Sequence, residues 1–196
     1  MTVIYFVRHA QSILIDRVEK DRPLSEKGTV DCVFVTEYLS DKAIDVVISS
    51  PYKRAVDTVL DFAGKDGFEI EIVEDFRDHN ISSAWLPSDE YFLIKEKHWA
   101  DFSYRLPDGE SLGEVQKRNI VALNDVLARS AGKNIVIGTH GTALSTIINY
   151  YDNTYGHQDF MDMVHKTPWI VKMIFDGNVF AEMEKIDLLP LKGVAL

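Results

Sequence analysis

A short apolar segment that ends in two ionisable residues constrains this chain more than any other feature. Residues 2–7 are apolar and β-branched, which is typical of a buried strand, and Arg8 and His9 follow at once. Such a strand delivers both side chains to one end of a sheet. In open α/β sheets, ligands bind beyond the carboxyl ends of the strands. The segment therefore predicts a binding site at the end of this strand.

The same pattern recurs twice further along the chain. Residues 134–139 form an apolar run that ends at His140 and Gly141, and residues 45–49 form another, with Arg54 shortly after it. Each of these groups alone could be an ordinary surface or core residue. Because parallel strands end at a shared sheet edge, we expect the groups to meet and form a dense cationic pocket. Arginine presents planar donors that match phosphate oxygens, so the pocket is suited to a phosphate group.

Strand and helix patterns alternate along the chain, which predicts an α/β fold. We expect three layers, in which a mostly parallel sheet carries helices on both faces. Ser25 is a candidate N-cap, and Ser111 with Glu114 matches a capping box. Two final strand patterns flank a turn at 176–178, which is typical of a hairpin. The expected strands are residues 2–7, 45–49, 68–73, 134–139, 169–175 and 179–186, and the expected helices begin near residues 25, 51, 111 and 142.

Residues 75–108 interrupt this alternation with an aromatic-rich segment of scattered charge. We expect a helical excursion from the sheet that forms a wall or lid of the pocket. A plain satellite core is the alternative. Residues 151–167 are expected to form a loop or a short helix. No linker or repeat divides the chain, so we expect a single domain over residues 1–196.

Composition and charge narrow the range of partners. The chain has 196 residues and a formal net charge of -10, which argues against nucleic acid or an anionic membrane as the main partner. A small anionic substrate is compatible with this charge, because a local cluster of arginine and histidine outweighs it. Cys32 is the single cysteine, so we expect no internal disulfide and no cysteine zinc site, and we expect Cys32 in the core. With no segment typical of a membrane span or signal peptide, we expect a cytoplasmic protein and leave a homodimer open.

Five short motifs follow one another along the chain. Arg-His-Ala-Gln-Ser stands at residues 8–12, Leu-Ser-Glu-Lys-Gly at 24–28 and Ser-Ser-Pro-Tyr-Lys-Arg-Ala at 49–55. Gly-Glu-Ser stands at 109–111 and Thr-His-Gly at 139–141. In this order they resemble the motifs of the histidine phosphatase superfamily, the phosphoglycerate mutase-like proteins. The resemblance covers most of the chain and implies a phosphoglycerate mutase-like fold.

The resemblance also implies roles for the residues at the strand ends. His9 would be the nucleophile that becomes phosphohistidine, which agrees with the nucleophilic character of a neutral imidazole. Arg8, Arg54 and His140 would hold the phosphoryl oxygens and stabilise charge in the transition state. Further phosphate contacts are expected from Gln11, Ser12 and Gly141.

The family uses a carboxylate after the third strand, first as an acid and then as a base. The family's Leu-x-Glu pattern aligns with residues 76–78, so the resemblance indicates Asp78, which is one methylene shorter than the commoner glutamate. Glu74, Asp75 and His79 are the alternatives. A general acid must be protonated near neutral pH, and we expect partial burial by the aromatic insert to favour that state.

Three departures from the family pattern bear on function. Ala10 replaces the common glycine, and Ile15 stands where many members have an asparagine that contacts phosphate. The long Tyr-Gly-x-Leu-x-Gly-Leu-Asn-Lys stretch of the sugar-phosphate mutases has no counterpart between Asp75 and Gly109. The absence of this stretch favours hydrolysis over phosphoryl transfer between sugar hydroxyls.

We therefore expect a metal-independent phosphomonoester hydrolase of the histidine acid phosphatase type, which acts on a small phosphorylated substrate through a phosphohistidine. A phosphoglycerate mutase is one alternative. A non-catalytic module that binds phosphorylated ligands is another, although both His9 and His140 are retained. No cofactor is expected. The histidines show no close-spaced ligand motif for a metal, and Arg8 and Arg54 already supply positive charge.

Overall fold

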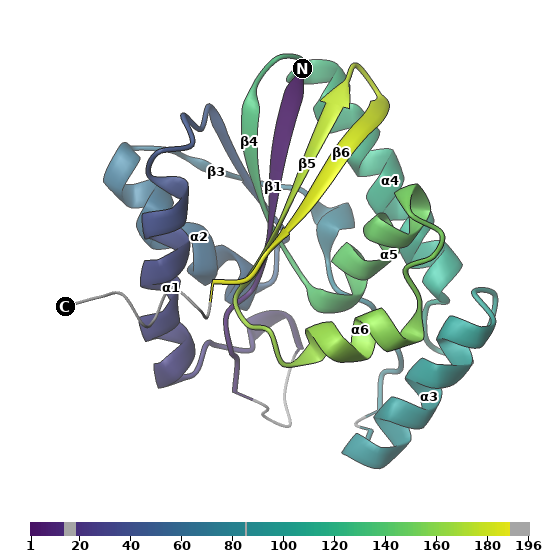
Figure 1. Ribbon diagram of the computed structural model, residues 1–196. Helices are drawn as coiled ribbons and strands as arrows, with labels where there is room; N and C mark the ends of the chain where they lie inside the picture. The colour runs from purple at the N-terminus through teal and green to yellow at the C-terminus, as the bar shows by residue number, and fades with distance from the viewer. Residues whose placement is uncertain (14–18, 85, 189–196) are drawn as a thin grey trace.

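The computed structural model of the chain describes residues 1–13, 19–84 and 86–188. Six strands within these residues form one sheet: β1 (Thr2–Arg8), β2 (Val46–Ser49), β3 (Ile70–Ile72), β4 (Asn134–Thr139), β5 (Trp169–Asp176) and β6 (Val179–Ile186). Their order is β3-β2-β4-β1-β5-β6 (Figure 1). The strands from β3 to β1 run parallel, whereas β5 and β6 are antiparallel to their neighbours. The expected α/β fold with a mostly parallel sheet is confirmed.

Helices cover both faces of this sheet: α1 (Glu26–Leu39), α2 (Lys53–Asp66), α3 (Ser88–Ala100), α4 (Leu112–Arg129), α5 (Gly141–Tyr151) and α6 (His157–Val164). Side chains alternate between the faces along β1. Ile4 and Phe6 belong to the core with α4, α5 and α6, and Tyr5 and Val7 belong to the core with α1 and α2. Because the central strand is buried on both faces, its sequence is continuously apolar.

Local sequence signals fix the ends of two helices. Ser25 caps α1 and accepts a hydrogen bond from the backbone N–H of Gly28. A Cβ at Gly28 would lie 2.0 Å from the backbone oxygen of Gln11, so this close approach of the loop after β1 requires glycine. Ser111 and Glu114 form the expected capping box at the start of α4.

The structure differs from the expected elements at β3, which is a short edge strand of three residues rather than the whole of 68–73. Residues 151–167, expected as a loop or a short helix, contain the short helix α6. Its aromatic face packs against α3: the ring centroids of Trp99 and Phe160 are 5.8 Å apart. Cys32 is buried, as expected. In the described part of the chain, every helix is too short or too polar to cross a membrane.

Candidate active site

The carboxyl ends of β1, β4 and β2 lie side by side, because these strands are neighbours and run parallel. Arg8 pairs with Thr139 across β1 and β4, so His9 and His140 follow the paired positions directly. The backbone N–H of His9 donates to the oxygen of Thr139 at 3.0 Å. The two imidazole rings have centroids 5.4 Å apart. The sheet register thus brings the two histidines together.

His9 presents one ring nitrogen to the site as a base. Its Nδ1 lies 2.7 Å from the backbone oxygen of Ala10. Because a carbonyl can only accept, Nδ1 carries the hydrogen and Nε2 keeps a free lone pair. Burial, together with the charges of Arg54 and Arg8, holds the pKa of His9 well below its usual range. His9 is therefore a neutral imidazole with Nε2 available for nucleophilic attack.

The guanidinium of Arg8 is held mainly by the carboxyl end of α6. Its terminal nitrogens donate to the backbone oxygens of Met163 at 2.6 Å, Lys166 at 2.9 Å and Val164 at 3.1 Å. Nε is buried and has no hydrogen-bond partner among the described residues. A Cβ at Gly141 would lie 3.2 Å from this nitrogen, so the start of α5 needs a small residue here. Nε is the donor that Arg8 can offer to an anion.

Arg54 sits in the first turn of α2 and is fully buried. One terminal nitrogen lies 2.9 Å from Oδ2 of Asp78 and 2.8 Å from Oε1 of Glu19. The other donates to the backbone oxygen of Glu19 at 2.8 Å. Glu19 is not singled out by the sequence analysis, because it lies in a polar connector with no apolar pattern.

Among the candidate acids, Asp78 is the one that reaches the histidines. Its Oδ2 lies 3.6 Å from Nδ1 of His140, besides its contact with Arg54. Glu74 is exposed, and Asp75 forms an ion pair with Arg77 at 3.0 Å. Distance therefore favours Asp78 over these two alternatives.

Arg118 of α4 fixes the loop that carries Asp78. Its guanidinium donates to the backbone oxygens of Asp75 at 2.7 Å, Arg77 at 2.8 Å and Asp78 at 2.9 Å. It also forms an ion pair with Glu110 at 2.9 Å. One side chain thus satisfies three carbonyl groups of a segment with little regular structure of its own.

The charge state of Asp78 differs from the expected one. Burial alone would raise the pKa of Asp78, and this was the basis for expecting a protonated acid. The groups that face it, first His140 and then Arg54, outweigh burial and hold its pKa well below the usual range. The ion pair with Arg54 at 2.9 Å keeps the carboxyl group ionised. The expectation that burial favours the protonated acid is therefore wrong for this arrangement of charges.

His140 is held by two residues that the sequence analysis did not single out. Ser50 Oγ lies 2.7 Å from Nε2 of His140, and the ring of Tyr52 packs against the imidazole with centroids 5.1 Å apart. Both residues lie within the Ser-Ser-Pro-Tyr-Lys-Arg-Ala motif, so the motif itself was the available signal. Burial keeps the pKa of His140 well below its usual range, and the ring is neutral.

Gln11 and Ser12 make their contacts at the start of α1. The side-chain oxygen of Gln11 accepts from Ser25 at 2.9 Å, and Ser12 forms an isolated bridge with Leu24. In the described part of the chain, neither of these contacts reaches His9. Their expected role in phosphate binding stays a prediction, and Ile15 lies outside the described residues.

One set of side chains has the spacing of a metal site. Single ligand atoms of His9, Asp78 and His140 all lie within 4.8 Å of one another. Arg54 is already in contact with the carboxylate of this set, at 2.9 Å. A metal ion would therefore be repelled by the nearby guanidinium, which makes the set better suited to an anion than to a second cation.

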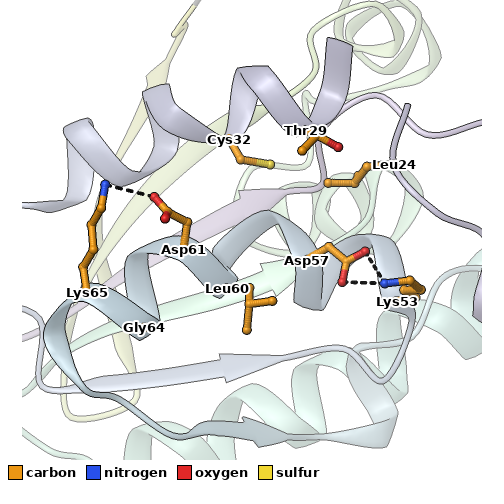
Figure 2. A pocket seen from close by; sticks show the side chains of 9 residues that line it. All are labelled: Leu24, Thr29, Cys32, Lys53, Asp57, Leu60, Asp61, Gly64 and Lys65. Carbon is orange, nitrogen blue, oxygen red and sulfur yellow. Dashed lines mark hydrogen bonds and ion pairs between the residues drawn. The ribbon is translucent and has the colours of Figure 1, made fainter. Parts of the chain in front are cut away.

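A surface groove lies between α1 and α2, away from these residues (Figure 2). Its volume is about 690 Å³. Its charged side chains are paired with one another, Lys53 with Asp57 at 2.7 Å and Lys65 with Asp61 at 3.1 Å. Burial raises the pKa of Cys32 beside it to about 11, so the thiol is unreactive. Among the described residues that line the groove there is no histidine or arginine, and both lysines are paired with carboxylates.

Known proteins resemble this chain in sequence and in fold. The profile of the histidine phosphatase superfamily (branch 1) matches residues 4–183. Phosphoserine phosphatase 1 of Hydrogenobacter thermophilus is 30% identical over 156 residues, which cover 71% of each chain. Probable phosphoglycerate mutase GpmB of Yersinia pestis is 25% identical over 159 residues, which cover 76% of this chain and 74% of that one. The structure of phosphoserine phosphatase from Entamoeba histolytica in complex with 3-phosphoglyceric acid has a TM-score of 0.76 at 20% identity, covering 96% of this chain and 100% of that one.

Proposed function

Because the chain belongs to the histidine phosphatase superfamily (branch 1), we propose that it hydrolyses phosphomonoesters through a phosphohistidine on His9. The observation that carries the proposal is the neutral His9, whose Nδ1 is engaged at 2.7 Å by the oxygen of Ala10, so that Nε2 is free. This nitrogen lies among Arg8, Arg54 and His140. A nucleophile surrounded by donors for an anion suits phosphoryl transfer.

Two displacements complete the reaction. Nε2 of His9 attacks phosphorus while the bond from phosphorus to the ester oxygen breaks, and Asp78 gives a proton to that oxygen. Water then attacks the phosphohistidine, Asp78 takes a proton from it, and phosphate leaves. Nε of Arg8 and the amino end of α5 face the transferred group and stabilise its charge.

The proton on Asp78 comes with the substrate. Its carboxyl group is ionised while Arg54 contacts it at 2.9 Å. A phosphoryl group draws that guanidinium to itself and adds negative charge, which raises the pKa of Asp78. The second pKa of a phosphate monoester is about 6, so the singly charged form can supply the proton in mildly acidic solution. This supports the acid phosphatase type of mechanism.

We also propose that residues 75–108 form the wall of the pocket on the side of the leaving group, within a single domain. Asp78 belongs to this segment and faces His140. The α3 helix follows it and packs on α6 through Trp99. A wall built from these two helices leaves room for a small phosphorylated substrate.

Trapping the intermediate tests the proposal. The wild-type protein and His9→Ala are mixed with ³²P-labelled phosphoserine and quenched in alkaline denaturant, because the P–N bond is labile in acid. Label should appear on the wild-type chain alone. A fully active His9→Ala protein would refute the proposal.

Product analysis distinguishes the hydrolase from the two alternatives, a phosphoglycerate mutase and a non-catalytic binding module. Free phosphate should accumulate in step with the dephosphorylated product. Interconversion of 2- and 3-phosphoglycerate that outpaces phosphate release would identify a mutase, and phosphate binding with no turnover of any ester would identify a binding module.

A further inference from the structure

A fully buried lysine stands at the junction of the insert and α5. Lys95 of α3 has no exposed surface. Its ammonium group lies 2.9 Å from Nδ1 of His79 and 2.7 Å from Oγ1 of Thr142. The rings of Tyr91 and Phe160 face it at 5.4 Å and 5.5 Å. Among the described residues, no carboxylate lies within ion-pair distance of this ammonium group.

Such a group is unfavourable for folding. A buried charge is normally paired, and one without a counterion destabilises the folded protein. Burial lowers the pKa of Lys95 to about 7, which reflects the same unfavourable environment. A methionine would fill the same space without a buried charge, although His79 and Thr142 would lose a donor. A buried cation at this cost to folding points to a function.

Lys95 lies near the part of the site where the leaving group is expected. Thr142 is in the first turn of α5, directly after His140 and Gly141. His79, its other partner, directly follows Asp78, which faces the ester oxygen in the proposed reaction. Lys95 is therefore placed beside the acid, on the side from which the leaving group departs.

The donors of the ammonium group allow a further contact. A lysine ammonium has three hydrogens, and the two contacts with His79 and Thr142 use two of them. The third is available to an acceptor of opposite charge. Asp78 acts on the ammonium group from beyond ion-pair distance and opposes the effect of burial on its pKa. A carboxylate is the group that would satisfy the third donor directly.

We propose that Lys95 is a specificity-determining residue that binds a carboxylate on the leaving group, so that the preferred substrates are phosphomonoesters of small hydroxy acids or hydroxy amino acids. This inference rests on the proposed hydrolase function. It differs from a purely structural role, in which Lys95 would only fasten the insert to α5.

Paired substrates that differ in the carboxylate test the inference. Phosphoserine is compared with phosphoethanolamine, and 3-phosphoglycerate with glycerol 3-phosphate, for the wild type, Lys95→Met and the control Lys97→Met. Lys97 lies on the same helix but is exposed. In the wild type and the control, kcat/KM should favour the carboxylate of each pair. In Lys95→Met this preference should fall by about 10- to 100-fold, the size of one hydrogen bond to a charged group.

For Lys95→Met, the loss of kcat/KM should be larger for the carboxylate member of each pair than for the member without a carboxylate. The melting temperature checks folding, because the change removes a buried charge but also takes a donor from His79 and Thr142. An equal loss of kcat/KM on both members of each pair would show that Lys95 only fastens the insert, and an unchanged preference would show that another group binds the carboxylate. Either result would overturn the inference.

A binding measurement separates this inference from the proposed hydrolysis. Calorimetry on His9→Asn gives the Kd of phosphoserine and phosphoethanolamine without turnover. The Kd ratio should favour phosphoserine and should collapse on adding Lys95→Met. Equal Kd values before that change would overturn the role of Lys95, whatever the wild-type protein hydrolyses. Absence of turnover in the wild type, with the expected Kd ratio, would instead overturn the proposed hydrolysis alone.

Discussion

The hydroxyl of Ser50 lies 2.7 Å from Nε2 of His140, and the contact orients the imidazole within the site. The same hydroxyl oxygen accepts from the backbone N–H of Tyr52 at 3.2 Å, so its own hydrogen can point to Nε2. We assign the neutral tautomer with hydrogen on Nδ1 from this network. That nitrogen faces Asp78 and can donate to a phosphoryl oxygen.

Replacing Ser50 by alanine should lower kcat by about tenfold. Losing a buried hydrogen-bond partner costs about 1–3 kcal/mol, and 1.4 kcal/mol corresponds to a factor of ten. Ser49→Ala is the matched control, since Ser49 Oγ is buried without a hydrogen-bond partner among the described residues. Steady-state kinetics of both variants, with near-UV circular dichroism as a check of folding, give the result. Equal kcat for the two variants would remove Ser50 from the site.

Asp78→Asn should slow the hydrolysis of alkyl phosphates far more than that of aryl phosphates. An asparagine cannot give a proton, and proton transfer matters most when the departing oxygen is strongly basic. The ratio of kcat/KM for phosphoserine and p-nitrophenyl phosphate measures the effect. If both substrates lose activity equally, then Asp78 is not the acid, and His79 becomes the next candidate.

The pH dependence of kcat/KM should reflect ionisation of the substrate's phosphate group rather than ionisation of Asp78. His140 and the guanidinium of Arg54 face Asp78 and hold its pKa below the usual range, so in the free enzyme the carboxyl group is ionised throughout the working range. The proton then arrives with the singly charged ester, whose fraction falls above about pH 6. The value of kcat/KM for phosphoserine should therefore decrease as pH rises through 6 to 8. For an ester whose second phosphate pKa is lower, the midpoint of the decrease should move down with that pKa. A midpoint that stays fixed would assign the decrease to a group of the enzyme.

Arg118→Lys should loosen the loop that carries Asp78. A lysine keeps the charge but cannot donate to the three carbonyl groups that Arg118 binds. We expect the free energy of unfolding to fall by about 1–3 kcal/mol and kcat to fall with it. Arg129→Lys is the control, because Arg129 forms its ion pairs at the surface, where each contributes less than about 1 kcal/mol. Urea denaturation compares them, and similar losses in both variants would contradict a specific role for Arg118.

Activity should not depend on a metal ion. The buried guanidinium groups of Arg8 and Arg54 supply the positive charge that a metal would provide. Dialysis against EDTA should leave kcat unchanged. Loss of activity on chelation and its recovery with Mg²⁺ or Zn²⁺ would contradict this.

The sequence predicted those parts of the site that depend on neighbouring strands. His9 and His140 converge because each follows a buried strand directly, and apolar runs reveal such strands. The contact of Glu19 with Arg54 could not be predicted, since the two residues are far apart in the sequence and Glu19 lies in a polar segment with no periodic pattern. The ionised state of Asp78 was missed for a related reason. Burial can be guessed from composition, but the sign of a pKa shift depends on which charges lie within a few ångströms.

Because α6 positions Arg8, mutations near α6 that alter substrate preference also affect phosphate binding. The backbone oxygens of Met163 and Lys166 keep the guanidinium in place, and α6 packs against the insert through Trp99 and Phe160. A mutation that shifts α3 to admit a bulkier leaving group also displaces the donor for the phosphoryl group. Variants of α3 that accept a wider range of substrates should therefore have a lower catalytic rate. Second mutations that restore the rate should lie at the carboxyl end of α6.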